Sequence, residues 1–425
     1  MSGYNLVSLV GLLGLIALAW VFSTNRRAVD KRLVLWALGL QLLFGLVVFV
    51  IPQGRQFFWW LNGVVVQLLS VSQAGTSFLF GPLAAGPGSE GSLGFILAFQ
   101  TLPAIIFFSA LVALLYYIGF MPMLVKLFAR IFAKTMGISG AESLSVASNI
   151  FVGVESAVTI KPHLPKMTAS EFCTVLTAGM ATVASNILAL YVFTLQDVFP
   201  AIAGHLISAS IISAPAAVLM SKILLPETEK PETQGEKVNP HYEKESNLFE
   251  AVINGAQNGV QLIVGVAALL IAVLGLVALL DLIFGGVSGW LGLPLTLRDL
   301  LGHLFYPLVL LMGIPTGDAA QVAAIVGERL LLTEVVSYQD LAQAMKLGQI
   351  TDPRSLVITS YALCGFAHFA SMAIFVGGIS ALVPERTKAI SQVGLRALVA
   401  ATMACLATGA VAGIFYNQSS LLLGG

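Results

Sequence analysis

The stretch SNIFVGVES, residues 148–156, decides how the rest of the chain is interpreted. It places the carboxylate of Glu155 a few residues after a short apolar run, between two long hydrophobic segments. A charged side chain at the centre of a bilayer costs about 2.5–3.5 kcal/mol on insertion scales, so such residues usually face a protein interior or a water-filled path. The stretch is therefore either a loop at a membrane surface or the tip of a re-entrant hairpin that binds a solute.

The composition is that of a membrane protein. Of the 425 residues, 57% are hydrophobic and only 10% are charged, and the mean hydropathy is +0.92. Soluble domains carry about 25% charged residues, so we expect an all-α polytopic membrane protein with the lipid bilayer as its surroundings. The net charge is zero, which gives no reason to expect a nucleic-acid partner. The three cysteines lie far apart in apolar runs and indicate packing, not a disulfide framework.

Eight apolar segments are long enough to cross a bilayer. They are residues 6–22, 33–51, 95–120, 172–193, 202–225, 262–284, 356–383 and 395–415. The four basic residues of the loop at 25–32 predict a cytoplasmic loop, so both termini are expected outside the cell (inner) membrane. The aromatic-rich segment 56–73 predicts an interfacial helix, with a short third span as the alternative.

Two segments predict re-entrant hairpins. Residues about 136–160 have basic residues on both sides and so enter and leave from the cytoplasm. Residues about 297–332 are interrupted by GIPTGD at 313–318 and enter from outside. Each hairpin is followed by a span with polar residues in its middle, which is the pattern of an inverted repeat with the solute site near the midplane.

This pattern divides the chain into five parts. They are N-terminal scaffold spans with the interfacial helix (1–94), a first repeat (95–225), a polar, solvated cytoplasmic linker (226–250), a second repeat (251–390), and the last span with an external tail (391–425).

Polar side chains in apolar surroundings are the candidate functional residues. The carboxylates of Glu155 and Glu334 can accept hydrogen bonds from a polyhydroxylated or heterocyclic solute, although a structural or surface role is the alternative. Asn149 with Thr182 suits Na⁺, which takes neutral side-chain oxygens and the carbonyls of unwound helix. Hydrogen bonding between helices or an N-cap explains the same pair equally well.

His368 and Ser371 lie three residues apart and so share a helical face, with packing as the alternative role for the imidazole. The sequence contains no nucleophile elbow, P-loop or HExxH motif, which argues against an enzyme and against an ATP-driven pump. No cofactor is expected.

At these positions the chain resembles the concentrative nucleoside transporters over nearly its whole length. The motifs that carry the resemblance are NIFVG at 149–153, GERLLLTEVVSY at 327–338, similar to the family's G-x-K-x-x-x-N-E-F-V-A-Y, and CGFAHFAS at 364–371, similar to GFAN-x-x-S. The resemblance implies a homotrimer with a fixed scaffold and a mobile transport domain. It also implies secondary active uptake of nucleosides, driven by sodium or sometimes by protons.

The resemblance further implies a set of site residues, in which the first hairpin reads the base and the second half reads the ribose. The substrate-binding residues it implies are Gly153, Val154, Glu155, Glu334, Phe366, His368 and Ser371. The sodium ligands it implies are Asn149, Val152, Thr182 and Val183.

The chain departs from the family pattern on the solute side. The first hairpin reads GVES at 153–156 where the family has G-Q-[ST]-E, and His368 stands where GFAN has Asn. We therefore expect a sodium-coupled symporter whose substrates include atypical or modified nucleosides. The alternatives are proton coupling, a non-nucleoside small polar solute and, from another class, a membrane protein that acts in assembly or signalling without transport.

Overall fold

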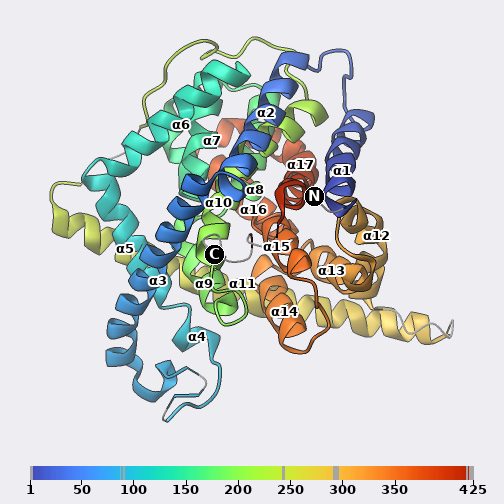
Figure 1. Cartoon of the computed structure of the whole chain (residues 1–425). Helices are drawn as coiled ribbons and strands as arrows, with labels where there is room; N and C mark the ends of the chain where they lie inside the picture. The colour runs from blue at the N-terminus through green and yellow to red at the C-terminus, as the bar shows by residue number, and fades with distance from the viewer. Residues whose placement is uncertain are drawn as a thin grey trace.

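The computed structural model of the chain describes residues 3–86, 88–89, 91–241, 245–290, 296–417 and 420, apart from the side chains of Val154 and residues 287–290. These residues form α-helices and short 3₁₀-helices, with no strand among them (Figure 1). A helix satisfies all of its backbone hydrogen bonds within one segment, which an apolar surrounding requires. The expected all-α fold is confirmed.

Three helices open the chain: α1 (Gly3–Val21), α2 (Lys31–Phe49) and α3 (Pro52–Phe80). α2 is capped by Asp30, whose side chain accepts a hydrogen bond of 2.8 Å from the backbone N–H of Arg32. α3 is one continuous helix of 29 residues and is therefore longer than the interfacial segment expected at 56–73.

In the segment expected as the first hairpin, the buried helix α7 and the partly exposed 3₁₀-helix η2 are joined at residues 150–153. The helix that follows is broken after Ala181, inside the segment 172–193 that was expected to be continuous. The elements are η1 (Gly81–Ala84), α4 (Leu97–Gln100), α5 (Ala104–Tyr117), α6 (Phe120–Met136), α7 (Gly140–Asn149), η2 (Val154–Lys166), α8 (Ala169–Ala181), α9 (Ser185–Leu195) and α10 (Ile202–Leu224).

The second half repeats the order of the first. Two helices, two arms joined by a turn, a broken helix and a buried closing helix follow one another, as they do from α5 to α10. The elements are α11 (Leu248–Trp290), α12 (Leu297–Leu311), α13 (Thr316–Glu328), α14 (Glu334–Lys346), α15 (Pro353–Ala362), α16 (Phe369–Leu382), η3 (Pro384–Arg386) and α17 (Thr387–Phe415).

Eight helical segments in the described part of the chain are long and apolar enough to cross a membrane. Their number equals the expected one, but two members differ. Pro52–Ala84 qualifies by length and composition, as in the alternative reading of that segment. Residues 356–383 do not qualify, because the chain is unwound between α15 and α16.

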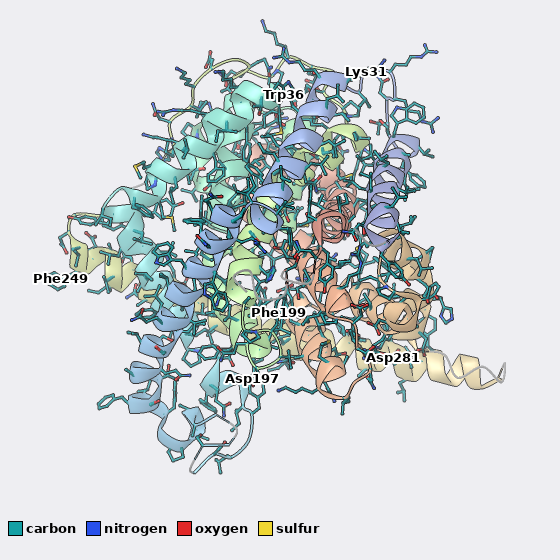
Figure 2. All side chains as sticks on the ribbon, in the orientation of Figure 1. Lys31, Trp36, Asp197, Phe199, Phe249 and Asp281 are labelled. Carbon is teal, nitrogen blue, oxygen red and sulfur yellow. The ribbon has the colours of Figure 1, made fainter. Side chains whose placement is uncertain are left out.

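The long helix α11 lies against α5 and crosses the molecule, with Phe249 and Asp281 on opposite sides (Figure 2). The two helices approach closely because α11 carries glycines at the contact. A Cβ added to Gly259 would lie 2.6 Å from the Cα of Ile106, and one added to Gly255 would lie 2.7 Å from the Cα of Ala110. Small residues permit this kind of contact between apolar helices.

The polar linker is mostly exposed, as the sequence predicts, and part of it packs onto α7 and η2. Thr233 is buried, and its carbonyl and hydroxyl oxygens accept hydrogen bonds from the backbone N–H groups of Gly140 (2.9 Å) and Ala141 (3.0 Å). Further along, the N–H of His241 donates to the carbonyl of Thr159 (2.8 Å). Residues 226–241, here called the strap, therefore cover the N-terminus of α7 and part of η2.

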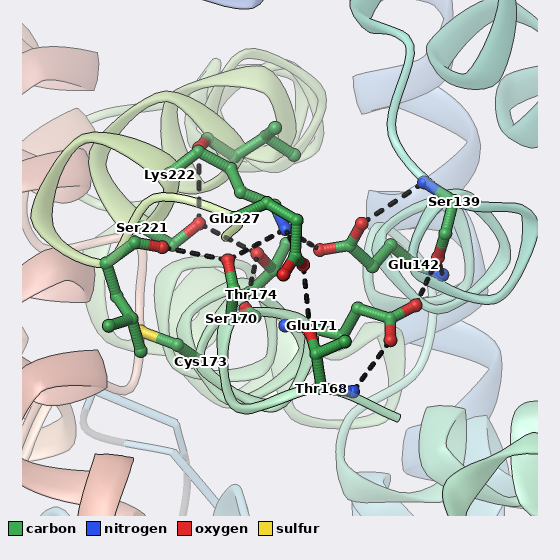
Figure 3. A network of polar contacts seen from close by, with 12 residues as sticks. Ser139, Glu142, Thr168, Ser170, Glu171, Cys173, Thr174, Ser221, Lys222 and Glu227 are labelled. Carbon is green, nitrogen blue, oxygen red and sulfur yellow. Dashed lines mark hydrogen bonds and ion pairs between the residues drawn. The ribbon is translucent and has the colours of Figure 1, made fainter. Parts of the chain in front are cut away.

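A buried charge network joins the strap to three helices (Figure 3). Lys222 of α10 lies 2.6 Å from Glu142 of α7 and 3.4 Å from Glu227 of the strap. Glu171 of α8 accepts a hydrogen bond of 2.6 Å from Ser139, the residue that caps α7. Because breaking such a pair leaves an uncompensated buried charge, the network favours one arrangement of hairpin, helices and strap.

Candidate functional site

The two broken helices meet at the centre of the molecule. Gly365 lies in the unwound segment between α15 and α16. A Cβ added there would lie 2.6 Å from the carbonyl oxygen of Met180 and 2.8 Å from the carbonyl carbon of Ala181. No side chain fits between backbones at that distance. The unwound segment 363–368 is therefore in direct contact with the C-terminal end of α8.

A cavity of about 520 Å³ opens beside this contact. Its wall combines the turn of the first hairpin, the start of α9, the turn between α13 and α14, residues 366–375 and one side of α11. This volume is within the range of about 300–1,000 Å³ that is usual for small-molecule sites. The cavity is therefore built by segments that are far apart in the sequence but related by the repeated order of elements.

Most of the residues implied for the substrate line this one cavity. The side chain of Val154 lies outside the described part of the structure, and its role stays a prediction. The lining residues from the implied set are Gly153, Glu155, Glu334, Phe366, His368 and Ser371.

Glu334 is the buried charge of the cavity wall. Its Oε1 accepts a hydrogen bond of 2.7 Å from the hydroxyl of Tyr191, and its Oε2 lies 3.0 Å from Nε2 of His368. The residue is also the first of α14, where the positive end of the helix dipole favours a carboxylate. Glu334 thus joins α9, α14 and the unwound segment before α16.

His368 caps α16, and this contact assigns its tautomer. Nδ1 accepts a hydrogen bond of 3.1 Å from the backbone N–H of Ser371. The ring proton therefore sits on Nε2 and is donated to Glu334. The hydroxyl of Ser371 donates to the carbonyl oxygens of His368 (2.7 Å) and Phe366. Both polar groups thus hold the unwound segment in place as well as facing the cavity.

Two further polar groups of the cavity wall were not in the implied set. The side-chain oxygens of Asn186 and Thr333 are buried and have no hydrogen-bond partner among the described residues, and both residues line the cavity. Buried polar groups are rarely left without a partner, so these oxygens are available to a solute. The sequence points to these two residues only because they lie close to implied site residues or breaks. Asn186 follows the break after α8, and Thr333 precedes Glu334.

The residues implied for sodium come together where the turn of the first hairpin meets the break after α8. Asn149 is buried at the end of α7, and its Oδ1 accepts a hydrogen bond of 2.9 Å from the hydroxyl of Ser156. Thr182 and Val183 are buried in the break. Ser210 of α10 binds both parts, because it donates to the carbonyl of Ile150 (3.0 Å) and accepts from the N–H of Val183 (3.4 Å).

The atoms at this junction that could act as ligands are uncharged oxygens. No group of three or more His, Cys, Asp or Glu side chains suited to a metal ion occurs in the described ranges. Side-chain amide, hydroxyl and backbone carbonyl oxygens at an unwound helix suit Na⁺. The hydroxyl of Ser156 was not part of the implied ligand set. Only the structure shows that it lies at this junction, in contact with Asn149.

Family models match most of the chain. The N-terminal model of the Na⁺ dependent nucleoside transporters matches residues 10–83, and the C-terminal model matches residues 205–413. A model described as nucleoside recognition matches residues 98–197, between the two. The chain belongs to the Na⁺ dependent nucleoside transporter family. The transporter is therefore an integral membrane protein and not an enzyme, which confirms both expectations.

Relatives and a solved structure agree with this family. The transporter is 36% identical to the nucleoside permease NupC of Helicobacter pylori, over 98% of this chain and 99% of that protein. It is 37% identical to sodium/nucleoside cotransporter 1 of Mus musculus, over 97% of this chain and 64% of that protein. It is 36% identical to the structure of CNTnw in an inward-facing substrate-bound state, with a TM-score of 0.87, over 97% of this chain and 98% of that one.

Proposed function

We propose that the transporter imports nucleosides by symport with sodium, with the nucleoside in the central cavity and the ion at the junction of the first hairpin and the break after α8. The observation that carries this proposal is that both breaks and two inter-helical turns converge on one cavity. Residues that bind the ion and residues that face the solute therefore share the same short segments.

The lining of the cavity combines polar and apolar residues, which suits the two halves of a nucleoside. Glu334, His368 and Thr333 can bind the ribose hydroxyls. Phe366 and the α11 residue Leu262 can pack against the base. Glu155 is exposed beside Gly153 and can accept hydrogen bonds from the amino or imino groups of a base.

Sodium occupancy is coupled to the solute through residues 149–156. Asn149 and the carbonyl of Val152 precede Gly153 and Glu155 in one tight turn. The same turn is bound to α9 by the hydrogen bond from the N–H of Ser185 to the carbonyl of Phe151 (3.0 Å). An ion that orders this turn therefore also positions the residues that face the solute.

We also propose the arrangement of the molecule in its membrane. The second hairpin comprises α13 and α14, with its turn at residues 329–333, because this turn lines the cavity and the turn at 313–318 does not. The other boundaries stay as expected, with the linker forming the strap. The transporter is a homotrimer in the cell membrane with both termini outside, as the resemblance and the basic loop at 25–32 imply.

The decisive experiment is uptake into proteoliposomes of a panel of labelled nucleosides, including modified ones, under an imposed sodium gradient or an imposed proton gradient. Accumulation driven by sodium alone is the expected result. Absence of uptake of every nucleoside under both gradients would contradict the substrate, and uptake driven by protons without sodium would contradict the ion.

A further inference from the structure

The helix α6 carries a row of basic side chains that the chain does not neutralise. Lys126, Arg130 and Lys134 follow one another at intervals of four residues, so they lie along one side of the helix. No aspartate or glutamate occurs from residue 91 to residue 141. Among the described residues, none of the three basic side chains is in an ion pair. These three residues are here called the basic ridge.

The position of α6 places the basic ridge at the cytoplasmic surface of the membrane. α6 lies at the periphery of the molecule (Figure 1). It joins the end of a candidate span, Leu97–Tyr117, to the start of the first hairpin at Ser139. In the proposed topology both of these points are cytoplasmic. A helix whose two ends lie on one side of the bilayer runs along the surface and does not cross it.

The outer surface of α6 combines this charge with apolar side chains. Met123 is 59% exposed and Leu127 is 51% exposed, whereas Phe132 is buried in the core. Arg130 and Lys134 are exposed in the half of the helix that follows. A surface helix that exposes both apolar and basic residues matches the boundary between the acyl chains and the headgroups of a bilayer.

We propose that the basic ridge is a docking site for anionic phospholipid headgroups of the cytoplasmic leaflet, and that an occupied site supports transport through the first hairpin. Charge complementarity selects this partner, because anionic headgroups lie at the depth of a surface helix and attract basic residues there. The exposed apolar residues beside the ridge distinguish a lipid from a soluble anion, since only a lipid also covers them with acyl chains.

The basic ridge is close in the chain to the solute site. α6 ends at Gly137, whose φ of +67° turns the chain toward Ser139, the cap of α7. α6 packs against α7, and α7 ends at Asn149, next to the turn that lines the cavity. A headgroup that holds α6 at the membrane surface therefore also fixes the start of the first hairpin. This link to uptake rests on the proposed function, whereas lipid binding does not.

Lipid binding is tested on the purified full chain in detergent, by native mass spectrometry with phosphatidylglycerol and with phosphatidylcholine. Each basic residue near an anionic surface contributes about fivefold in affinity, so the ridge variant, Arg130→Gln with Lys134→Gln, is expected to bind phosphatidylglycerol about 25-fold more weakly than the wild type. The charge-conserving variant, Arg130→Lys with Lys134→Arg, is expected to keep the wild-type affinity. So is the control variant, Arg27→Gln with Lys31→Gln, in the exposed loop on the same side of the membrane.

Three results would overturn the docking site. The first is equal affinity of the wild type for the two lipids. The second is an equal loss of affinity in the ridge variant and the control variant, which would indicate diffuse surface charge. The third is displacement of bound phosphatidylglycerol by inorganic phosphate, which would indicate a site for a free anion. Because the substituted side chains are exposed, the ridge variant is expected to melt as the wild type does without added lipid.

Uptake under a sodium gradient tests the consequence for transport. Proteoliposomes of phosphatidylcholine alone are compared with proteoliposomes that also contain phosphatidylglycerol. We expect phosphatidylglycerol to raise nucleoside uptake by the wild type and the control variant but not by the ridge variant. An equal rise in all three would contradict the link to transport. Absence of nucleoside uptake in every liposome, with lipid binding intact, would contradict the proposed function and leave the docking site unaffected.

Discussion

At the scale of residues, the proposed contact with the ribose depends on one carboxylate with two fixed donors. Glu334 has Tyr191 on one oxygen and His368 on the other. Glu334→Gln loses the charge that both donors bind and that we propose a sugar hydroxyl binds. Because a hydrogen bond to a charged group contributes about 1.5–3 kcal/mol, we expect the KM for nucleoside uptake to rise about tenfold or more. Glu229→Gln, on the exposed part of the strap, is the matched control and should leave KM unchanged.

His368 caps α16, although the family motif has asparagine at this position. Asparagine is a good N-cap, and the imidazole Nδ1 performs the same task here. We expect His368→Asn to melt close to the wild type and His368→Ala to lose about 1 kcal/mol of stability. Thermal unfolding in detergent measures both. Equal melting temperatures for the two variants would contradict the capping role.

The proposed sodium site leads to a prediction for Asn149. In that site its Oδ1 is a ligand that alanine cannot replace, so Asn149→Ala is expected to abolish the sodium dependence of uptake. Ser145→Ala removes a neighbouring hydroxyl that is not in the ligand set and should keep that dependence. Uptake by Asn149→Ala that follows the sodium gradient with unchanged affinity would place the ion elsewhere.

At the scale of elements, the strap adds hydrogen-bond acceptors at the N-terminus of α7, which Ser139 caps. Thr233→Val removes the hydroxyl that accepts the N–H of Ala141, while Thr228→Val alters an exposed position of the same segment. We expect amide hydrogen exchange at residues 140–143 to rise only in Thr233→Val. The loss of a cap costs about 1 kcal/mol, which corresponds to about a fivefold increase in exchange.

At the scale of the whole molecule, orientation can be tested at two ends that lie far apart. Lys31 and Asp197 lie at opposite ends of the molecule (Figure 2), Asp30 and Asp197 are exposed, and all three native cysteines are buried. We expect a membrane-impermeant maleimide to label Asp197→Cys in intact cells and Asp30→Cys only after lysis. The reverse result would invert the proposed topology.

Much of the fold and of the candidate site could be predicted from the sequence, because the length of apolar segments and the placement of charges are local properties. The spans, the first hairpin and the motifs around Asn149, Glu334 and His368 all depend on a few neighbouring residues. The sequence predicts the second hairpin at about 297–332, where GIPTGD at 313–318 gives a strong turn signal, whereas we propose that it lies one element later, in α13 and α14. The turn at 329–333 has no glycine or proline, and only its contact with the cavity distinguishes it.

The sequence by itself determined the fold class, the family and the segments that carry the site. Only the tertiary structure decided which atoms face one another there. The tautomer of His368, the open oxygens of Asn186 and Thr333 and the strap over α7 all depend on contacts between distant segments. Such contacts leave no periodic signal, because each depends on where two unwound segments meet in space and not on the order of residues within either.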